Sequence, residues 1–350
     1  MAKLALELGL VDELQQREAV REQLITLVGR DPEHNSFSQI WLSTYQAALP
    51  APQPATGHKV GIVVAQGVIM DGDQPQGSVG GASTAWLLRQ ARFDDNITAV
   101  VRRIDSPGGS AFASDLIRAE VDELKKAGKP VVASMGSLAA SGGYWIAAAA
   151  DEIWAAPTTI TGSIGIFGLI TTIDRAMNHW GLNSDGVGTS DLAGALTITR
   201  PVAPGVGRII QQSIDHGYRQ FLELVAHERE MSLEAVDKVA QGRVWSGRQA
   251  QGLGLVDQIG GLDDAVAAAA RLAQLEQYQR ETVSPPLNLR DQLLRDLFDQ
   301  ASLLLPAATT TSLPPQLAAF SQQLQQQLQQ MAQWNDPNHA YALCAECPLP

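Results

Sequence analysis

Two glycine-rich junctions carry the residues that could do chemistry. They read Asp105-Ser-Pro-Gly-Gly-Ser110 and Ala139-Ala-Ser-Gly-Gly-Tyr144, and each follows a strand pattern and precedes a helical one. Backbone N–H groups at such a junction are unpaired at the positive end of the helix dipole, and glycine lets a ligand approach them closely. In a parallel sheet both junctions would face one crevice beyond the strand ends. The pair therefore predicts an oxyanion hole for acyl chemistry.

Ser141 opens the second helix beside the N–H of Gly142, which is the placement of a serine nucleophile. The alternative is that its hydroxyl merely caps the helix. A nucleophilic hydroxyl also needs a base, and no residue of the chain is an obvious one. The 6 histidines follow no motif, and the lysines fall at helix ends, strand starts or polar faces. A Ser-Lys dyad confined to this chain has poor support.

The elements that must position these junctions alternate between two periodicities. Short β-branched runs predict strands over 59–65, 98–105 and 130–134, and apolar residues at helical spacing predict helices over 84–91 and 111–127. This order indicates βαβ units and a mainly parallel sheet, hence an α/β fold. Beyond Pro201 the chain turns helical.

The ends of the helix over 111–127 can be predicted from single residues. Ser110 is its expected N-cap, while Lys125 and Lys126 fall in the negative last turn and Gly128 stops the helix. The first glycine-rich junction is thus tied to a well-defined helix start.

An internal similarity connects the first residues with a later segment. Ala5-Leu-Glu-Leu-Gly-Leu-Val-Asp12 recurs as Ala250-Gln-Gly-Leu-Gly-Leu-Val-Asp257, where it closes the α/β region. The first copy therefore looks like the end of a domain whose body is absent, and chance similarity is the less favoured interpretation. The sequence divides into a remnant of a preceding repeat (1–14), a helix with a Pro-rich linker (15–57), the α/β domain (58–275) and a Pro/Gln-rich C-terminal extension (276–350).

Composition excludes several classes of protein. With 350 residues, 45% hydrophobic and 18% charged, the chain is globular, and its net charge of -12 argues against nucleic-acid or anionic-lipid partners. No apolar run reaches the roughly 20 residues that span a bilayer, and the first residues lack the pattern of a signal peptide. The segment 321–333 is expected to be an exposed helix. Cys344 and Cys347 form half a metal site at most, so a local disulfide or two free thiols are expected instead.

Five short stretches of the sequence together carry a resemblance to a known family. They are Ser106-Pro-Gly-Gly109, Met135-Gly-Ser-Leu-Ala-Ala-Ser-Gly-Gly-Tyr144, Thr161-Gly-Ser-Ile-Gly165, Gly242-Arg-Val-Trp-Ser-Gly247 and Gly254-Leu-Val-Asp257. In these stretches the chain resembles the signal peptide peptidase SppA (protease IV) family, serine peptidases with the ClpP/crotonase fold. The tail around Asn335-Asp-Pro, with its two cysteines, also resembles the C-terminal end of the long, two-repeat form of that family.

The resemblance implies a role for each matching residue. Ser141 falls on the nucleophile, Gly109 and Gly142 on the backbone donors of the oxyanion hole, and Ser163 on the serine that orients a catalytic lysine. The lysine itself is not matched, because Thr189 stands in or near its place. In the long form the first repeat supplies this lysine. The hypothesis is that this chain is half of a catalytic unit and needs a lysine in trans.

The function implied by the resemblance is a serine endopeptidase that hydrolyses hydrophobic signal peptides without metal or organic cofactor. It implies a ring-like oligomer on the outer, periplasmic face of the bacterial cytoplasmic membrane, held by an N-terminal anchor that this chain does not contain. A first alternative is a catalytically incomplete module that grips peptides without cutting them. A second is a crotonase-like acyl-CoA enzyme, disfavoured because the nucleophile position holds Ser141 and no catalytic carboxylate is evident in the junctions.

Overall fold

The computed structural model forms two compact units, Met1–Ala55 and Thr56–Pro350. It describes residues 2–33, 36–49, 57–75, 77–190, 193–195, 197–285, 335–337 and 340–344. Most of the Pro-rich linker and the whole of the expected helix 321–333 lie outside these residues. The first unit contains α1 (Ala2–Glu7), α2 (Arg17–Val28), α3 (Leu42–Ala48) and the antiparallel pair β1 (Arg30–Asp31) and β2 (Ser36–Phe37).

The two similar sequence segments adopt the same local structure. In the first, the N–H of Leu10 donates to the carbonyl of Ala5 at 2.8 Å, and in the second the N–H of Leu255 donates to Ala250 at 2.9 Å. Their environments differ, since Leu10 is 74% exposed and Leu255 is fully buried. The shared sequence therefore specifies a helix-ending turn, and within the described residues only the second copy packs into a core.

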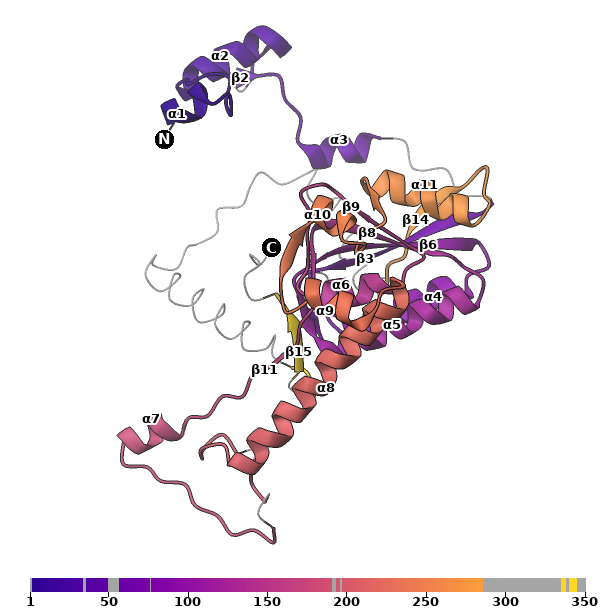
Figure 1. Cartoon of the computed structure of the whole chain (residues 1–350). Helices are drawn as coiled ribbons and strands as arrows, with labels where there is room; N and C mark the ends of the chain where they lie inside the picture. The colour runs from indigo at the N-terminus through magenta and orange to yellow at the C-terminus, as the bar shows by residue number, and fades with distance from the viewer. Residues whose placement is uncertain are drawn as a thin grey trace. The chain divides into compact units, whose positions relative to one another are not determined.

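The second unit is built on a sheet, which Figure 1 shows around the labels β3, β6 and β8. Its strands run in the order β12-β10-β8-β6-β3-β14, with β9 beside β8 and β13 beside β9. Every pairing is parallel except that of β10 with β12, which confirms an α/β fold with βαβ units. The strands are β3 (Lys59–Gln66), β6 (Ile97–Ser106), β8 (Val131–Ala140), β9 (Glu152–Ala155), β10 (Ile160–Gly162), β12 (Val244–Ser246), β13 (Gln258–Ile259) and β14 (Gln279–Thr282).

Helices cover both faces of this sheet because its strands are apolar on both sides. Alternate residues of β6 separate accordingly, with Val101 packing towards α11 (Leu262–Leu272) and Val100 packing with Ile117 and Val121 of α5 (Ala111–Lys126). The second face also carries α4 (Gly81–Phe93) and α6 (Gly142–Ala148) (Figure 1).

The long helix α8 (Pro204–Glu228) packs its C-terminal half on α6, where Phe221 and Trp145 place their ring centroids 4.5 Å apart. Among the residues that the structure describes, no helix is both long and apolar enough to cross a membrane. The remaining helices are α7 (Asp174–His179), α9 (Leu233–Val239) and α10 (Gly247–Gly252).

The expected strand over 130–134 is longer than predicted, because β8 continues to Ala140. It continues past a register shift opposite β6, where Asp105 accepts a hydrogen bond from the N–H of Leu138 at 2.9 Å. The predicted helix start is confirmed, since the Ser110 hydroxyl accepts from the N–H of Ala113 at 3.1 Å.

A second, five-stranded sheet lies beside the first and has the order β11-β15-β7-β4-β5. Its β15 comes from the C-terminal extension and pairs antiparallel with both β7 and β11. Figure 1 shows this strand in yellow, next to the β11 label. The strands are β4 (Ile69–Met70), β5 (Val79–Gly80), β7 (Gly108–Ser110), β11 (Phe167–Gly168) and β15 (Ala340–Leu343).

Candidate active site

Ser141 stands alone between β8, which ends at Ala140, and α6, which begins at Gly142. Its backbone has φ 54° and ψ -115°, a conformation that non-glycine residues rarely adopt. Its hydroxyl makes no capping hydrogen bond to α6, so the interpretation of Ser141 as a helix cap is wrong. A strained serine on a sharp strand-to-helix turn is the geometry of a serine nucleophile in other hydrolases.

The glycines of the two junctions meet beside Ser141. A Cβ atom built on Gly108 would lie 2.6 Å from the nitrogen of Gly142, and one built on Gly142 would lie 3.2 Å from the Cα of Gly108. Gly109 follows in β7 with φ 154°, and a Cβ there would lie 1.9 Å from the carbonyl oxygen of Ile69. The structure thus brings Gly142 and the β7 glycines together, and any side chain at these positions would prevent their approach.

Ser163 lies on the other side of Ser141, in the loop that follows β10. The N–H of Ser141 donates to the carbonyl of Gly162 at 2.8 Å, and its hydroxyl lies 3.5 Å from the carbonyl oxygen of Gly165. Ser163 also has a positive φ, 49°, and its N–H donates to the carbonyl of Arg243 at 2.6 Å. Both serines are therefore held by backbone contacts within the same loop cluster.

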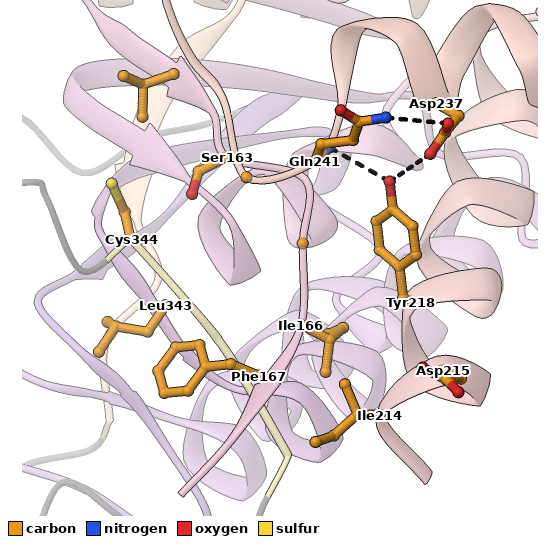
Figure 2. Close-up of a pocket in the computed structure, with 13 residues that line it drawn as sticks. Ser163, Ile166, Phe167, Ile214, Asp215, Tyr218, Asp237, Gln241, Leu343 and Cys344 are labelled. Carbon is orange, nitrogen blue, oxygen red and sulfur yellow. Dashed lines mark hydrogen bonds between the residues drawn. The ribbon is translucent and has the colours of Figure 1, made fainter. Parts of the chain in front are cut away.

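A cavity of about 570 Å³ adjoins this cluster and has Ser163 and Gly165 in its wall (Figure 2). On the opposite wall, Asp237 accepts hydrogen bonds from the Tyr218 hydroxyl at 2.6 Å and from the Gln241 amide at 3.2 Å. Desolvation and this hydrogen bond raise the pKa of Tyr218 to about 12, so the phenol stays protonated at neutral pH. Sequence reasoning missed these side chains because they lie on or beside ordinary amphipathic helices without a motif.

Comparison with known proteins assigns this chain to a family. The model of peptidase family S49 matches residues 123–276. The chain is 37% identical to a putative protease of Synechocystis over 190 residues, which cover 54% of this chain and 68% of that protein. The chain belongs to peptidase family S49. This confirms the resemblance to the SppA family, whose members are serine peptidases.

A further relative of this S49 chain is "Protease 4" of Salmonella typhi, with 41% identity over 346 residues. That alignment covers 99% of the chain and 55% of the Salmonella protein, so the chain spans about half the length of that relative. Among solved structures, a ClpP1 mutant of Listeria monocytogenes is similar at a TM-score of 0.40 and 17% identity, over 59% of this chain and 94% of ClpP1. This likeness is too loose to bear on the site.

The lysines of this chain lie away from the cavity beside Ser163. All six are among the described residues, and none is in its wall. Lys125 donates to the carbonyl of Ala149 at 3.0 Å, and Lys129 to that of Ala91 at 3.0 Å. Thr189, which aligns near the lysine position, is exposed. Four histidines are described, and none of them lines this cavity; His34 and His339 lie outside the described residues.

Both serines of the candidate site are covered in this structure. Ser141 is 1% exposed and Ser163 is 6% exposed. The tail packs beside them, because Cys344 contacts Leu138 and Ala140 at the end of β8. Cys344 is bonded in a disulfide, whereas Cys347 lies outside the described residues.

Within the described part of the chain, no group of three or more His, Cys, Asp or Glu residues could hold a metal ion.

Proposed function

We propose that this chain carries the nucleophile half of a serine endopeptidase site. Ser141 is the nucleophile, the N–H groups of Gly109 and Gly142 bind the oxyanion, and Ser163 orients a lysine supplied by another repeat in trans. The observation that carries this proposal is the strained turn at Ser141, whose hydroxyl makes no capping bond and which adjoins the point where Gly108 and Gly142 of the two junctions meet.

The chemistry follows the pattern of acyl transfer. The Oγ atom of Ser141 attacks the peptide carbonyl carbon while its proton passes to the lysine amine. The carbonyl oxygen becomes an anion, which the two backbone N–H groups stabilise. The C–N bond then breaks and the leaving amine takes the proton from the lysine. Water attacks the acyl-enzyme and releases the second product and the serine hydroxyl.

A lysine in trans explains how the base could work. To accept a proton at neutral pH, the amine must have a pKa well below its usual value of about 10.4, and burial lowers it. The cavity beside Ser163 offers a partly enclosed wall for such a side chain. Nearly the whole of this chain aligns, at 41% identity, with only 55% of "Protease 4", so the rest of that relative has room for a second repeat as the source of the lysine. The substrates would be hydrophobic signal peptides at the periplasmic face of a membrane.

A fluorophosphonate probe tests the nucleophile directly. The chain alone and the chain mixed with a lysine-bearing S49 repeat are incubated with the probe, and labelling is located by peptide mass spectrometry. We expect labelling of Ser141 that increases with the added repeat and is lost in Ser141→Ala. Ser137→Ala is the matched control, since Ser137 is an exposed serine of β8. Peptide hydrolysis that survives Ser141→Ala would refute the assignment.

A second candidate is a peptide-binding module without catalysis. It is favoured by the position of the lysines, none of which borders the cavity. Under this alternative, peptides bind beside Ser141 but the probe does not label it, even when the lysine-bearing repeat is present. The same labelling experiment therefore separates the two functions.

A further inference from the structure

β15 lies between the edges of β7, which contains Gly108 and Gly109, and β11. It is antiparallel to β7, with Ala342 opposite Gly109 and Leu343 opposite Gly108, and antiparallel to β11, with Tyr341 opposite Phe167. A strand added between two strand edges is a recurrent way to bind a peptide, because backbone hydrogen bonds on both sides provide the affinity. The tail is therefore seated as a peptide would be.

One carbonyl of this strand occupies the neighbourhood of the glycine junctions. A Cβ atom built on Gly108 would lie 2.0 Å from the carbonyl oxygen of Ala342, and one built on Gly142 would lie 2.9 Å from it. The N–H of Cys344 donates to Pro107 at 2.8 Å, so the alternation of an antiparallel ladder makes Ala342 and Gly109 the next hydrogen-bonded pair. This oxygen is placed as the carbonyl of a bound substrate would be.

The segment before β15 is fixed by two polar anchors. Asn335 exchanges hydrogen bonds with the backbone of Asp71, at 2.9 Å to the N–H and 3.1 Å to the carbonyl. Asp336 is 2% exposed and accepts from the Ser110 hydroxyl at 2.6 Å and from the N–H of Phe112 at 3.0 Å. A buried carboxylate is stabilised there by the charge-assisted bonds and the positive end of α5. The anchors therefore hold β15 at the glycine junctions.

Leu343 and Cys344 complete the cover. Both lie in the wall of the cavity that Ser163 also lines, and Figure 2 shows Leu343 beside Phe167 along the yellow tail strand. With β15 in place, Ser141 is 1% exposed. A peptide and β15 cannot occupy the space between β7 and β11 together.

We propose that residues 335–337 and 340–344 are a tethered occupant of the peptide groove, and that a substrate peptide binds only after β15 has left. The inference rests on the proposed function for the identity of the groove, but it concerns binding and does not require catalysis. Because the tail is part of the chain, its effective concentration at the groove is of millimolar order or higher. A free peptide must compete against that concentration.

Peptide binding to the full-length chain tests the proposal. The probe is a fluorescein-labelled peptide with the tail sequence Asn-His-Ala-Tyr-Ala-Leu, and its dissociation constant is measured by fluorescence anisotropy in a Ser141→Ala background. Asp336→Ala removes the buried anchor, so we expect at least about tenfold tighter probe binding. Asp263→Ala, at an 82% exposed carboxylate of α11, is the matched control and should leave binding unchanged.

A second variant protects the test against misfolding. Ala342→Pro removes the backbone N–H that β15 needs for its ladder and leaves every anchor residue in place. It should tighten probe binding like Asp336→Ala, with far-UV circular dichroism unchanged. Equal dissociation constants for the parent chain and the folded variants would overturn the proposal.

The outcomes also separate this inference from the proposed function. If the variants bind the probe more tightly but Ser141 is never labelled or active with a lysine-bearing repeat, the tethered tail stands and the peptidase proposal fails. If Ser141-dependent hydrolysis occurs and neither tail variant changes the Michaelis constant or probe binding, the peptidase proposal stands and the tethered tail fails.

Discussion

Ala342 of β15 and Gly109 of β7 are register partners, and the carbonyl oxygen of Ala342 also lies against Gly142. This relationship indicates which residue of a bound peptide would face the nucleophile. Ala342 is fully buried, so the groove has little room for a larger side chain there, whereas Leu343 lies in the cavity wall. We therefore expect Ala342 and Leu343 of the tail to occupy the positions of the two substrate residues on either side of the cleaved bond.

We therefore expect a preference for a small residue at the Ala342 position of a bound peptide. In the Asp336→Ala, Ser141→Ala chain, replacing that alanine of the probe by phenylalanine should weaken binding about fivefold or more, because overpacking a buried site costs about 1–3 kcal/mol. Replacing the following leucine by methionine, of similar volume, should change binding by less than about threefold. Equal affinity for all three probes would refute this expectation.

Ser110 makes two side-chain hydrogen bonds, and comparison with a second capping serine separates their contributions to stability. It caps α5 and also donates to buried Asp336, whereas Ser232 caps α9, accepting from Ala235 at 3.2 Å, and bonds only the exposed carboxylate of Glu234. Ser232→Ala should cost about 1 kcal/mol of unfolding free energy and Ser110→Ala about 3 kcal/mol, since the latter also removes a hydrogen bond to a buried charged group. Urea denaturation measures both values. Equal losses would show that the contact with Asp336 contributes nothing.

Gly109 of β7 has no room for a side chain. Gly109→Ala combines a positive φ with a Cβ that would meet backbone at 1.9 Å, and we expect a loss of at least about 3 kcal/mol. Gly72 has φ 75° and open space around its Cα, so Gly72→Ala should cost only about 1–2 kcal/mol. Thermal unfolding of the two variants compares the clash with conformational strain alone. A Gly109→Ala chain as stable as Gly72→Ala would contradict the close packing of β7 on β4.

Alkaline pH should lower the free energy of unfolding through Tyr218, which lies in the wall of the cavity. Tyr218 has its pKa raised to about 12, mainly by desolvation, against about 10 in an unfolded chain. The folded state therefore keeps the phenol proton to higher pH, and this stabilising contribution, complete below pH 10, is lost as pH rises towards 12. Denaturant unfolding at pH 9, 10 and 11 should show a shallower decline for Tyr218→Phe than for the parent chain. Parallel declines would mean that Tyr218 titrates normally.

Local patterns in the sequence were sufficient for the elements that hold the junctions. Ser110 caps α5 because its side chain accepts a hydrogen bond from a free N–H of the first helical turn. Gly128 follows the helix with φ 77°. The strand ahead of Ser141 was predicted too short, because serines and glycine in 134–137 look like loop residues. The hydrogen bond from Leu138 to Asp105 keeps that segment in the sheet, and it joins two strands that sequence periodicity treats separately.

The cover over the site had no local signal. The contact between Ser110 and Asp336 joins residues 226 positions apart, and the four residues of β15 are too few to show a strand periodicity. The walls of the cavity were missed for a similar reason, since Tyr218 and Asp237 come together only when α8 and α9 pack. The roles of Gly109, Gly142 and Ser163 remain predictions that the labelling experiment can test.

The backbone at Ser141 restricts which amino acids this position accepts. With φ 54° and ψ -115°, the backbone at Ser141 disfavours a residue that is branched at Cβ, so threonine fits this turn poorly although it also carries a hydroxyl. Cysteine has no branch at Cβ. The turn itself thus favours an engineered thiol version of the site over a threonine version.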